Sequence, residues 1–127
     1  MPLVRIDLVE GKSKEFRRAV GDVIYEAMVD VLKAPVDDRF QIVSQHSPED
    51  HIADEHYLDL QRTKDCIFIQ MFLLPGRSVE QKRKFYEAVA DGLHQRLGHR
   101  REDIFIGLVE VARENWSFGN GEAQYAD

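Results

Sequence analysis

Residues 11–40 read GKSKEFRRAVGDVIYEAMVDVLKAPVDDRF, and this stretch decides the fold because the chain contains its pattern twice. Residues 76–105 read GRSVEQKRKFYEAVADGLHQRLGHRREDIF and follow the same pattern at a constant offset of 65 positions. Within these two stretches, seven pairs of identical residues keep this offset: Gly11 and Gly76, Ser13 and Ser78, Glu15 and Glu80, Arg18 and Arg83, Leu32 and Leu97, Asp38 and Asp103, and Phe40 and Phe105. Self-similarity at one fixed offset indicates a duplicated structural unit.

Each copy contains one amphipathic helix. Apolar residues at spacings of three and four predict a helix over Phe16–Leu32, with Ser13 as its N-cap. We expect Pro35 to end this helix, because proline lacks the backbone donor and restricts the residue before it. In the second copy the same spacing predicts a helix over Val79–Leu97, which Gly98 ends as a C-terminal cap.

Each helix is flanked by two predicted strands, and the four strands are Leu3–Val9, Phe40–Ser44, Cys66–Leu74 and Ile104–Val111. Two right-handed βαβ units side by side predict an α/β fold, a tandem β-α-β repeat. Its architecture is an α+β sandwich, in which a four-stranded sheet carries two helices on one face. The bare face of such a sheet needs cover, and self-association is the simplest way to supply it. We expect a single domain over residues 1–127, made of a βαβ half at 1–46, a loop at 47–64, a βαβ half at 65–112 and a C-terminal segment at 113–127.

The segment between the two halves is the least regular stretch of the chain. Residues 46–64 are predicted to form a long loop with one short extended piece near Tyr57–Leu60. His46, His51 and His56 recur every five residues, a spacing that places them on different faces of a helix or a strand. They are therefore interpreted as separate, pH-sensitive surface histidines, and no metal site is expected.

The C-terminal segment carries three aromatic residues, Trp116, Phe118 and Tyr125, around the turn signal Asn120-Gly121. Aromatic side chains on a short polar tail are poorly buried in a monomer. Two interpretations stay open: the aromatic residues cover a pocket or a subunit contact, or they belong to a hairpin that closes its own core.

Bulk composition disfavours several classes of protein. The 127 residues are 43% hydrophobic and 31% charged, as in ordinary globular domains. No apolar run approaches the roughly 20 residues of a membrane span and no secretory signal is recognised, so no membrane partner is expected. The net charge of −6 and the pI near 5.3 disfavour a nucleic-acid partner. A single cysteine, Cys66, together with the lack of a signal, favours a cytoplasmic protein.

Pro2 occupies a position that gives it useful chemistry. A small second residue allows removal of Met1, which would expose the secondary amine of the proline at the start of the first strand. α-Amino groups titrate at about 7.7–8.0 in model peptides, and desolvation or a nearby cation lowers that pKa further. A neutral amine on a rigid ring beside a pocket is suited to act as a general base.

Four blocks of sequence carry a resemblance to a known family: PLVRIDLVEG at 2–11, PVDDRFQIVSQH at 35–46, GRSVEQK at 76–82 and NWSFGNG at 115–121. Together they resemble the tautomerase superfamily, and within it the malonate semialdehyde decarboxylase-like group. The resemblance covers nearly the whole chain. It implies a β-α-β repeat fold, a homotrimer, and the amino-terminal proline, here Pro2, as the catalytic residue in a pocket near the subunit boundary.

The resemblance also assigns two charged residues. The family's carboxylate beside the proline falls on Asp38, which would orient the ammonium or activate a water; alternatively, Asp38 is a turn acid like its repeat partner Asp103. The family's substrate-binding arginine falls on Arg77, whose guanidinium would hold a carboxylate bidentately and polarise a carbonyl. Alternatively, Arg77 is merely exposed, as its repeat partner Lys12 would be. Where the decarboxylase has a second arginine, this chain has Pro75.

These assignments lead to a hypothesis of enzymatic function. Pro2, as the neutral base, moves a proton between an enol oxygen and carbon of a small 2-oxo or 3-oxo carboxylic acid, while Arg77 holds the carboxylate and Asp38 assists. This chemistry needs no cofactor and no metal. Decarboxylation or hydration, as in malonate semialdehyde decarboxylase, is the first alternative, and a non-catalytic trimer that binds a small carboxylate is the second. Further candidates for lining the pocket and binding the substrate are Phe40, Trp116 and Phe118.

Overall fold

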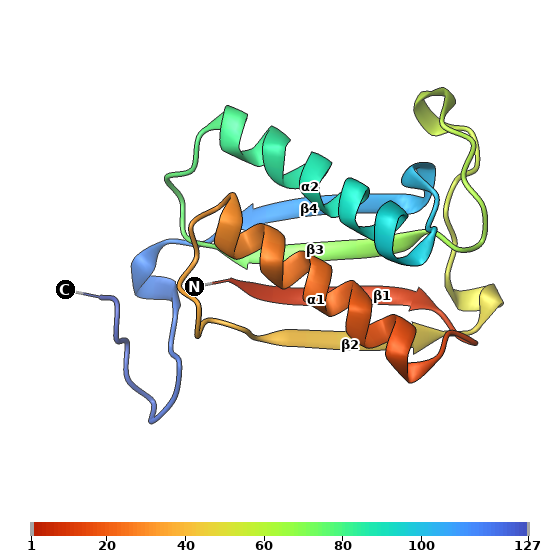
Figure 1. Cartoon of the computed structure of the whole chain (residues 1–127). Helices are drawn as coiled ribbons and strands as arrows, with labels where there is room; N and C mark the ends of the chain where they lie inside the picture. The colour runs from red at the N-terminus through yellow and green to blue at the C-terminus, as the bar shows by residue number, and fades with distance from the viewer. Residues whose placement is uncertain (1, 127) are drawn as a thin grey trace.

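The computed structural model describes residues 2–126 (Figure 1). Met1, whose removal the sequence predicts, and Asp127 lie outside the described residues. The helices and strands follow one another as β1 (Leu3–Val9), α1 (Lys14–Asp30), β2 (Gln41–His46), β3 (Ile67–Leu73), α2 (Val79–Leu97) and β4 (Ile104–Glu110). Short 3₁₀ turns occupy Pro48–Asp50, Tyr57–Asp59, Arg101–Asp103 and Arg113–Asn115.

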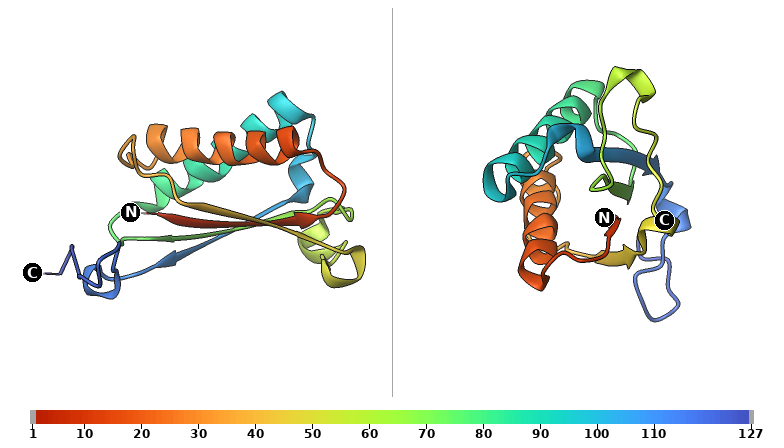
Figure 2. Two further views of the ribbon diagram at one scale, coloured as in Figure 1. Left: turned by 90° about the horizontal axis from the view of Figure 1, so that it is seen from below. Right: turned by 90° about the vertical axis from the view of Figure 1, so that its right-hand side faces the viewer.

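The four strands form one sheet in the order β2-β1-β3-β4. β1 runs parallel to β2 and β3 runs parallel to β4, while β1 and β3 pair antiparallel at the centre. Both helices lie on the same face of this sheet, as the side view in Figure 2 shows. The predicted tandem β-α-β fold with two helices on one face is therefore confirmed.

Local sequence signals start and end the helices as expected. The Ser13 hydroxyl oxygen accepts a hydrogen bond from the backbone N–H of Phe16 at 3.0 Å, which caps α1. Ser78 and Gln81 form a reciprocal capping box at the start of α2, and Gly98 ends that helix at a positive φ of 65°. The core between helices and sheet is apolar, and its fully buried side chains include Val4, Ile6, Leu8, Ile24, Met28, Ile69, Met71, Phe85, Val89 and Leu93.

The other face of the sheet is apolar but open. The side chains of Ile42, Phe105 and Val109 lie on the face away from the helices. Their partners in the neighbouring strands are Arg5, Phe68 and Phe72, and these positions alternate with the buried core positions of β1 and β3. These residues are partly exposed to solvent: Ile42 by 42%, Phe105 by 49% and Val109 by 40%. This face is the surface for which the sequence predicts cover from other copies of the chain.

Two local predictions were wrong. Helix α1 ends at Asp30 rather than Leu32, several residues before Pro35, because the chain leaves the helical path and Lys33 adopts a left-handed φ of 60°. Leu32 nevertheless stays buried as part of the hydrophobic core. The segment near Tyr57 is a 3₁₀ turn and not an extended piece, because the Asp54 carboxylate accepts the backbone N–H groups of His56 and Tyr57.

The histidines of the connecting segment are also arranged differently from the prediction. The rings of His46 and His51 stack with their centroids 5.8 Å apart, although their spacing had placed them on different faces. His51 is buried rather than at the surface, because the loop folds back over β3 and its ring nitrogen lies 2.6 Å from the Cys66 carbonyl oxygen. His46 instead bonds Asp7 at 2.6 Å. Within residues 2–126, no three His, Cys, Asp or Glu side chains are grouped to hold a metal ion, and none of the helices there is long and apolar enough to cross a membrane.

Candidate active site

The topology brings the predicted site residues to one edge of the sheet. β1 starts at this edge directly after Pro2, and the backbone N–H of Val4 bonds the Phe40 carbonyl oxygen at 3.0 Å, which places the start of β2 beside it. β3 ends at the same edge and leads into the turn that holds Arg77. The C-terminal segment reaches it from β4, so that the amino terminus, the β3–α2 loop and the C-terminal segment all lie at one end of the molecule (Figure 1).

A cavity of about 260 Å³ lies at this edge. Four residues predicted from the sequence line it: Pro2, Phe40, Trp116 and Phe118. Leu3 and Ser117 also line it, and the prediction missed these two. The missed residues are sequence neighbours of predicted ones, so adjacency is the signal that identifies them. Pro2 itself is buried. The cavity is therefore an apolar-walled space with the proline at its boundary.

Two aromatic residues of the C-terminal segment, Trp116 and Phe118, line this cavity rather than forming a hairpin with its own core. The rings of Trp116 and Phe118 stack at 5.4 Å, and the ring of Tyr125 packs edge-on against Phe118 at 4.9 Å. The indole N–H of Trp116 donates to the Val111 carbonyl oxygen at 3.2 Å, which fixes the segment to the end of β4. Between residues 113 and 126 the described chain contains no β-strand. The first of the two interpretations left open by the sequence is therefore the one the structure adopts.

Asp38 is a buried carboxyl group close to two positive charges. Its side chain is only 2% exposed, and its backbone N–H closes a turn by bonding the Pro35 carbonyl oxygen at 3.1 Å. Burial raises the pKa of Asp38, while the positive charge of the amino terminus and that of Arg77 act in the opposite direction. Asp38 is not among the residues that line the cavity itself. A buried acid with a raised pKa is a feature typical of acid–base sites.

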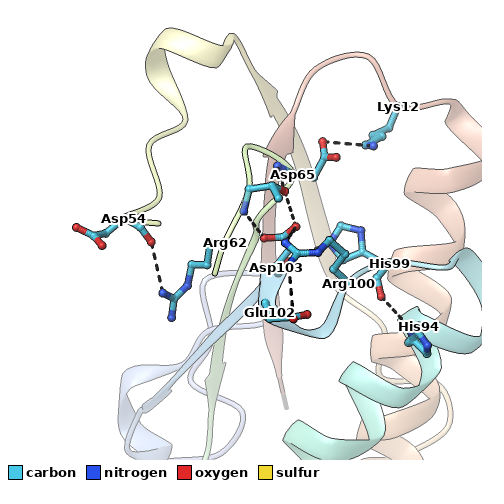
Figure 3. Close-up of polar contacts among 10 residues, drawn as sticks. Lys12, Asp54, Arg62, Asp65, His94, His99, Arg100, Glu102 and Asp103 are labelled. Carbon is cyan, nitrogen blue, oxygen red and sulfur yellow. Dashed lines mark hydrogen bonds and ion pairs between the residues drawn. The ribbon is translucent and has the colours of Figure 1, made fainter. Parts of the chain in front are cut away.

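The repeat partner of Asp38 shows what a purely structural acid looks like in this fold. Asp103 is fully buried and accepts hydrogen bonds from the backbone N–H and the hydroxyl of Thr63. It also accepts a hydrogen bond from Arg100, and both residues are labelled in Figure 3. Burial alone would raise the pKa of Asp103, but these donors outweigh it and hold the pKa below its ordinary value. The residue 65 positions after Pro2 is Ile67, whose nitrogen is an amide inside the chain. The second copy therefore has a stabilised carboxylate and no amine.

Arg77 is held rigidly by backbone acceptors. Its Nε donates to the Leu32 carbonyl oxygen at 3.2 Å, and its Nη1 donates to the Leu74 carbonyl oxygen at 3.3 Å. The alternative that Arg77 is merely exposed is therefore wrong, because the side chain is half-buried and its charge acts on Asp38. It lies outside the lining of the cavity, as Asp38 does. Its repeat partner Lys12 instead forms an ion pair with Asp65 at 3.4 Å.

This arrangement combines an amino-terminal proline in an apolar cavity, a buried acid with a raised pKa and a fixed arginine. Such a set can move protons on a small anionic molecule, because a base, an acid and a cation for the anion meet at one edge. The molecule is thus a small β-α-β repeat protein whose second residue lines an apolar cavity, with Asp38 and Arg77 at the same end of the sheet.

Comparison with known proteins agrees with this description. A family model described as "Tautomerase enzyme" matches residues 38–119, and a second model with the same description matches residues 2–60. The chain is 38% identical over 124 residues to the probable tautomerase YusQ of Bacillus subtilis, covering 98% of both chains. It therefore belongs to the tautomerase family of enzymes.

Two solved structures resemble the chain along nearly its whole length. FG41 malonate semialdehyde decarboxylase inhibited by 3-bromopropiolate is 41% identical, with a TM-score of 0.90 over 97% of this chain and 93% of that one. Another malonate semialdehyde decarboxylase, for which decarboxylase and hydratase activities are described, is 32% identical, with a TM-score of 0.90 over 97% and 95% of the two chains. The predicted membership of the malonate semialdehyde decarboxylase-like group is confirmed.

Proposed function

We propose that the chain is a cofactor-independent tautomerase that uses Pro2 as a general base on a small 2-oxo or 3-oxo carboxylic acid. The observation that carries the proposal is the cavity bounded by Pro2 and three aromatic residues, with Asp38 and Arg77 at the same edge. With Met1 removed, the neutral proline nitrogen takes the proton from the enol hydroxyl. The resulting ammonium then delivers a proton to the carbon, so the base is regenerated when the ketone leaves.

Each neighbour contributes to this reaction through its charge or shape. The buried surroundings of Pro2 favour the uncharged amine over the ammonium, because burial penalises the charged form. The guanidinium of Arg77 has its Nη2 hydrogens free of the two backbone bonds that hold it, and these would receive the substrate carboxylate. Asp38 orients the ammonium. Phe40, Trp116 and Phe118 exclude water from the reacting carbon.

Hydration or decarboxylation is the second candidate, favoured by the likeness to two malonate semialdehyde decarboxylases. In that reaction Pro2 would act in its protonated form, and Asp38 would direct a water. Pro75 stands at the position where the resemblance expects a second arginine, so it removes one cation from the arrangement. For this reason proton transfer, which needs fewer charged groups, is the first proposal. A non-catalytic trimer that binds a small carboxylate is the remaining alternative.

We also propose that the chain forms one domain that assembles as a homotrimer in the cytoplasm. The open face of the sheet supports the assembly, because Ile42, Phe105 and Val109 leave apolar surface exposed there. Cys66 is a free, buried cysteine, which fits a reducing compartment. Subunit contacts at the edge of the sheet where β1 starts would also complete the walls of the Pro2 cavity.

The experiment that tests the function compares the mature protein with Pro2→Ala in the ketonisation of an enolpyruvate. Intact mass confirms first that Met1 is absent from both proteins, because an acylated Pro2 nitrogen cannot act as a base. Loss of the ring amine should lower kcat/KM by about 10²–10⁴-fold, the usual contribution of a positioned general base. Equal rates in the two processed proteins would refute the mechanism. Hydration of the same substrates, followed in parallel, separates the first candidate from the second.

A further inference from the structure

A second cavity lies between α1 and the edge strand β2. Its volume is about 580 Å³, larger than that of the cavity beside Pro2. The two cavities have no lining residue in common. The α1–β2 cavity, as we call it, is lined by Lys14, Arg17, Arg18, Gly21, Arg39, Gln41 and Val43.

One wall of the α1–β2 cavity is strongly cationic. Lys14, Arg17 and Arg18 come from the first turns of α1 at spacings of three and four, which places them on neighbouring parts of one helix face. Within residues 2–126 none of these three side chains forms an ion pair, although Arg17 donates one hydrogen bond to the Lys12 carbonyl oxygen at 3.3 Å. This cluster of positive charge stands out in a chain whose net charge is −6.

The floor of the cavity is rigid and hydrogen-bonded. Arg39 pairs with Asp22 at 2.8 Å and lies over the ring of Tyr25 at 5.0 Å. Its Nε also donates to the side-chain amide oxygen, Oε1, of Gln41 at 3.3 Å. Gln41 in turn donates its side-chain N–H to the Gly21 carbonyl oxygen at 2.9 Å. A Cβ at Gly21 would lie only 2.6 Å from the Gln41 side-chain oxygen. The cavity therefore depends on a glycine at this position of the helix.

The second copy of the repeat shows that these features do not come with the fold. Tyr86 stands where the first copy has Gly21, and Ile106 stands where it has Gln41. Lys82, the partner of Arg17 in the repeat, is neutralised by Glu110 at 3.1 Å. The remaining cavity residues Lys14, Arg18, Arg39 and Val43 correspond to Val79, Arg83, Ile104 and Leu108. The second copy thus keeps one exposed cation, whereas the open floor and the cluster of three unpaired cations belong to the first copy.

We propose that the α1–β2 cavity binds a small ligand that carries two or more adjacent phosphate groups. A rise of about 1.5 Å per residue separates Lys14 and Arg18 by roughly 6 Å along the helix axis, so the three cations can reach successive phosphates. Arginine is suited to this task because its planar fork donates bidentately to phosphate oxygens. The start of α1 adds the positive end of the helix dipole. The volume is within the range of small-molecule sites.

Titration calorimetry of the full-length, assembled protein with inorganic tripolyphosphate tests this proposal. The double variant Arg17→Gln/Arg18→Gln should bind tripolyphosphate about tenfold or more weakly than the unaltered protein, because it loses charge-assisted hydrogen bonds. Lys14→Gln, which alters an exposed residue at the helix start, should weaken binding in the same direction. Arg83→Gln is the matched control, because it removes the repeat partner of Arg18 from the exposed face of α2.

The outcomes are distinct. Binding that falls in the α1 variants and stays within about twofold in Arg83→Gln supports a site at the α1–β2 cavity. No binding by the unaltered protein at low salt, or equal losses in the α1 variants and Arg83→Gln, would overturn it. Circular dichroism establishes that the helices of the variants are intact. Pro2→Ala should bind tripolyphosphate as tightly as the unaltered protein, so failure of the proposed catalysis and failure of this site are separately visible.

Discussion

The two repeat-related aspartates should respond in opposite ways to loss of their charge. Asp103 accepts two hydrogen bonds from Thr63 and one from Arg100. Hydrogen bonds to a charged group contribute about 1.5–3 kcal/mol each, and the Arg100 bond falls at the low end because 41% of that side chain is exposed. Asparagine keeps one acceptor oxygen but turns an NH₂ group toward a donor. Asp103→Asn should therefore lower the free energy of unfolding by about 2–4 kcal/mol.

Urea unfolding at fixed protomer concentration measures this loss, since assembly makes stability depend on concentration. The pKa of Asp103 is held below its ordinary value, so its carboxylate stabilises the folded state above the unfolded pKa of about 3.9. That stabilisation disappears as the pH falls through the folded pKa. The difference between the unaltered protein and Asp103→Asn should consequently be full at pH 7 and should shrink below about pH 4.

Asp38→Asn is the matched control. Burial raises the pKa of Asp38, so the folded state holds its proton more firmly and the ionised carboxylate at pH 7 is disfavoured there. Removing this charge should leave the free energy of unfolding at pH 7 unchanged or slightly increased, while activity falls. Equal destabilisation by Asp103→Asn and Asp38→Asn would refute the distinction between a structural acid and a site acid.

Three further predictions concern the site and its surroundings. Arg77→Lys keeps the positive charge but loses the planar guanidinium that can donate two hydrogen bonds to a carboxylate. KM for a carboxylate substrate should therefore rise about tenfold, with a smaller change in kcat. An unchanged KM would exclude Arg77 from substrate binding. Trp116→Ala opens the aromatic cover and loses one hydrogen bond, so kcat/KM should fall about tenfold. The free energy of unfolding should fall by only about 1 kcal/mol, and a large loss of stability with unchanged kcat/KM would contradict this role. Burial raises the pKa of Cys66 to about 11, so iodoacetamide should leave the native thiol unmodified at pH 8 and label it only in urea, as mass spectrometry can show.

Much of the fold could be predicted because it is encoded locally and then repeated. The 3.6-residue and two-residue periodicities place the helices and strands within a few residues, and Ser13, Ser78 and Gly98 mark their ends. The errors arose where contacts between distant or irregular segments decide the backbone. The turn at Tyr57 depends on the Asp54 side chain, and the position of His51 depends on a carbonyl group 15 residues away.

The site was predictable in its membership but not in its geometry. The strand register alone brings Pro2 and Phe40 together, and the return of the chain after β4 adds Trp116 and Phe118. The bonds that hold Arg77 could not be foreseen, because they depend on how the end of α1 meets β3. The same holds for the α1–β2 cavity, since it depends on contacts between side chains and backbone about 20 residues apart.

Covalent labelling of the processed protein tests the central claim most directly, because it asks whether the Pro2 nitrogen is a reactive amine. A 3-bromopropiolate molecule that enters the cavity should be attacked by the neutral proline nitrogen. Peptide mapping by mass spectrometry should then find the adduct on Pro2, with activity lost in proportion to labelling. Protein that has lost Met1 and remains unlabelled at Pro2, or that is labelled elsewhere while activity disappears, would contradict the account.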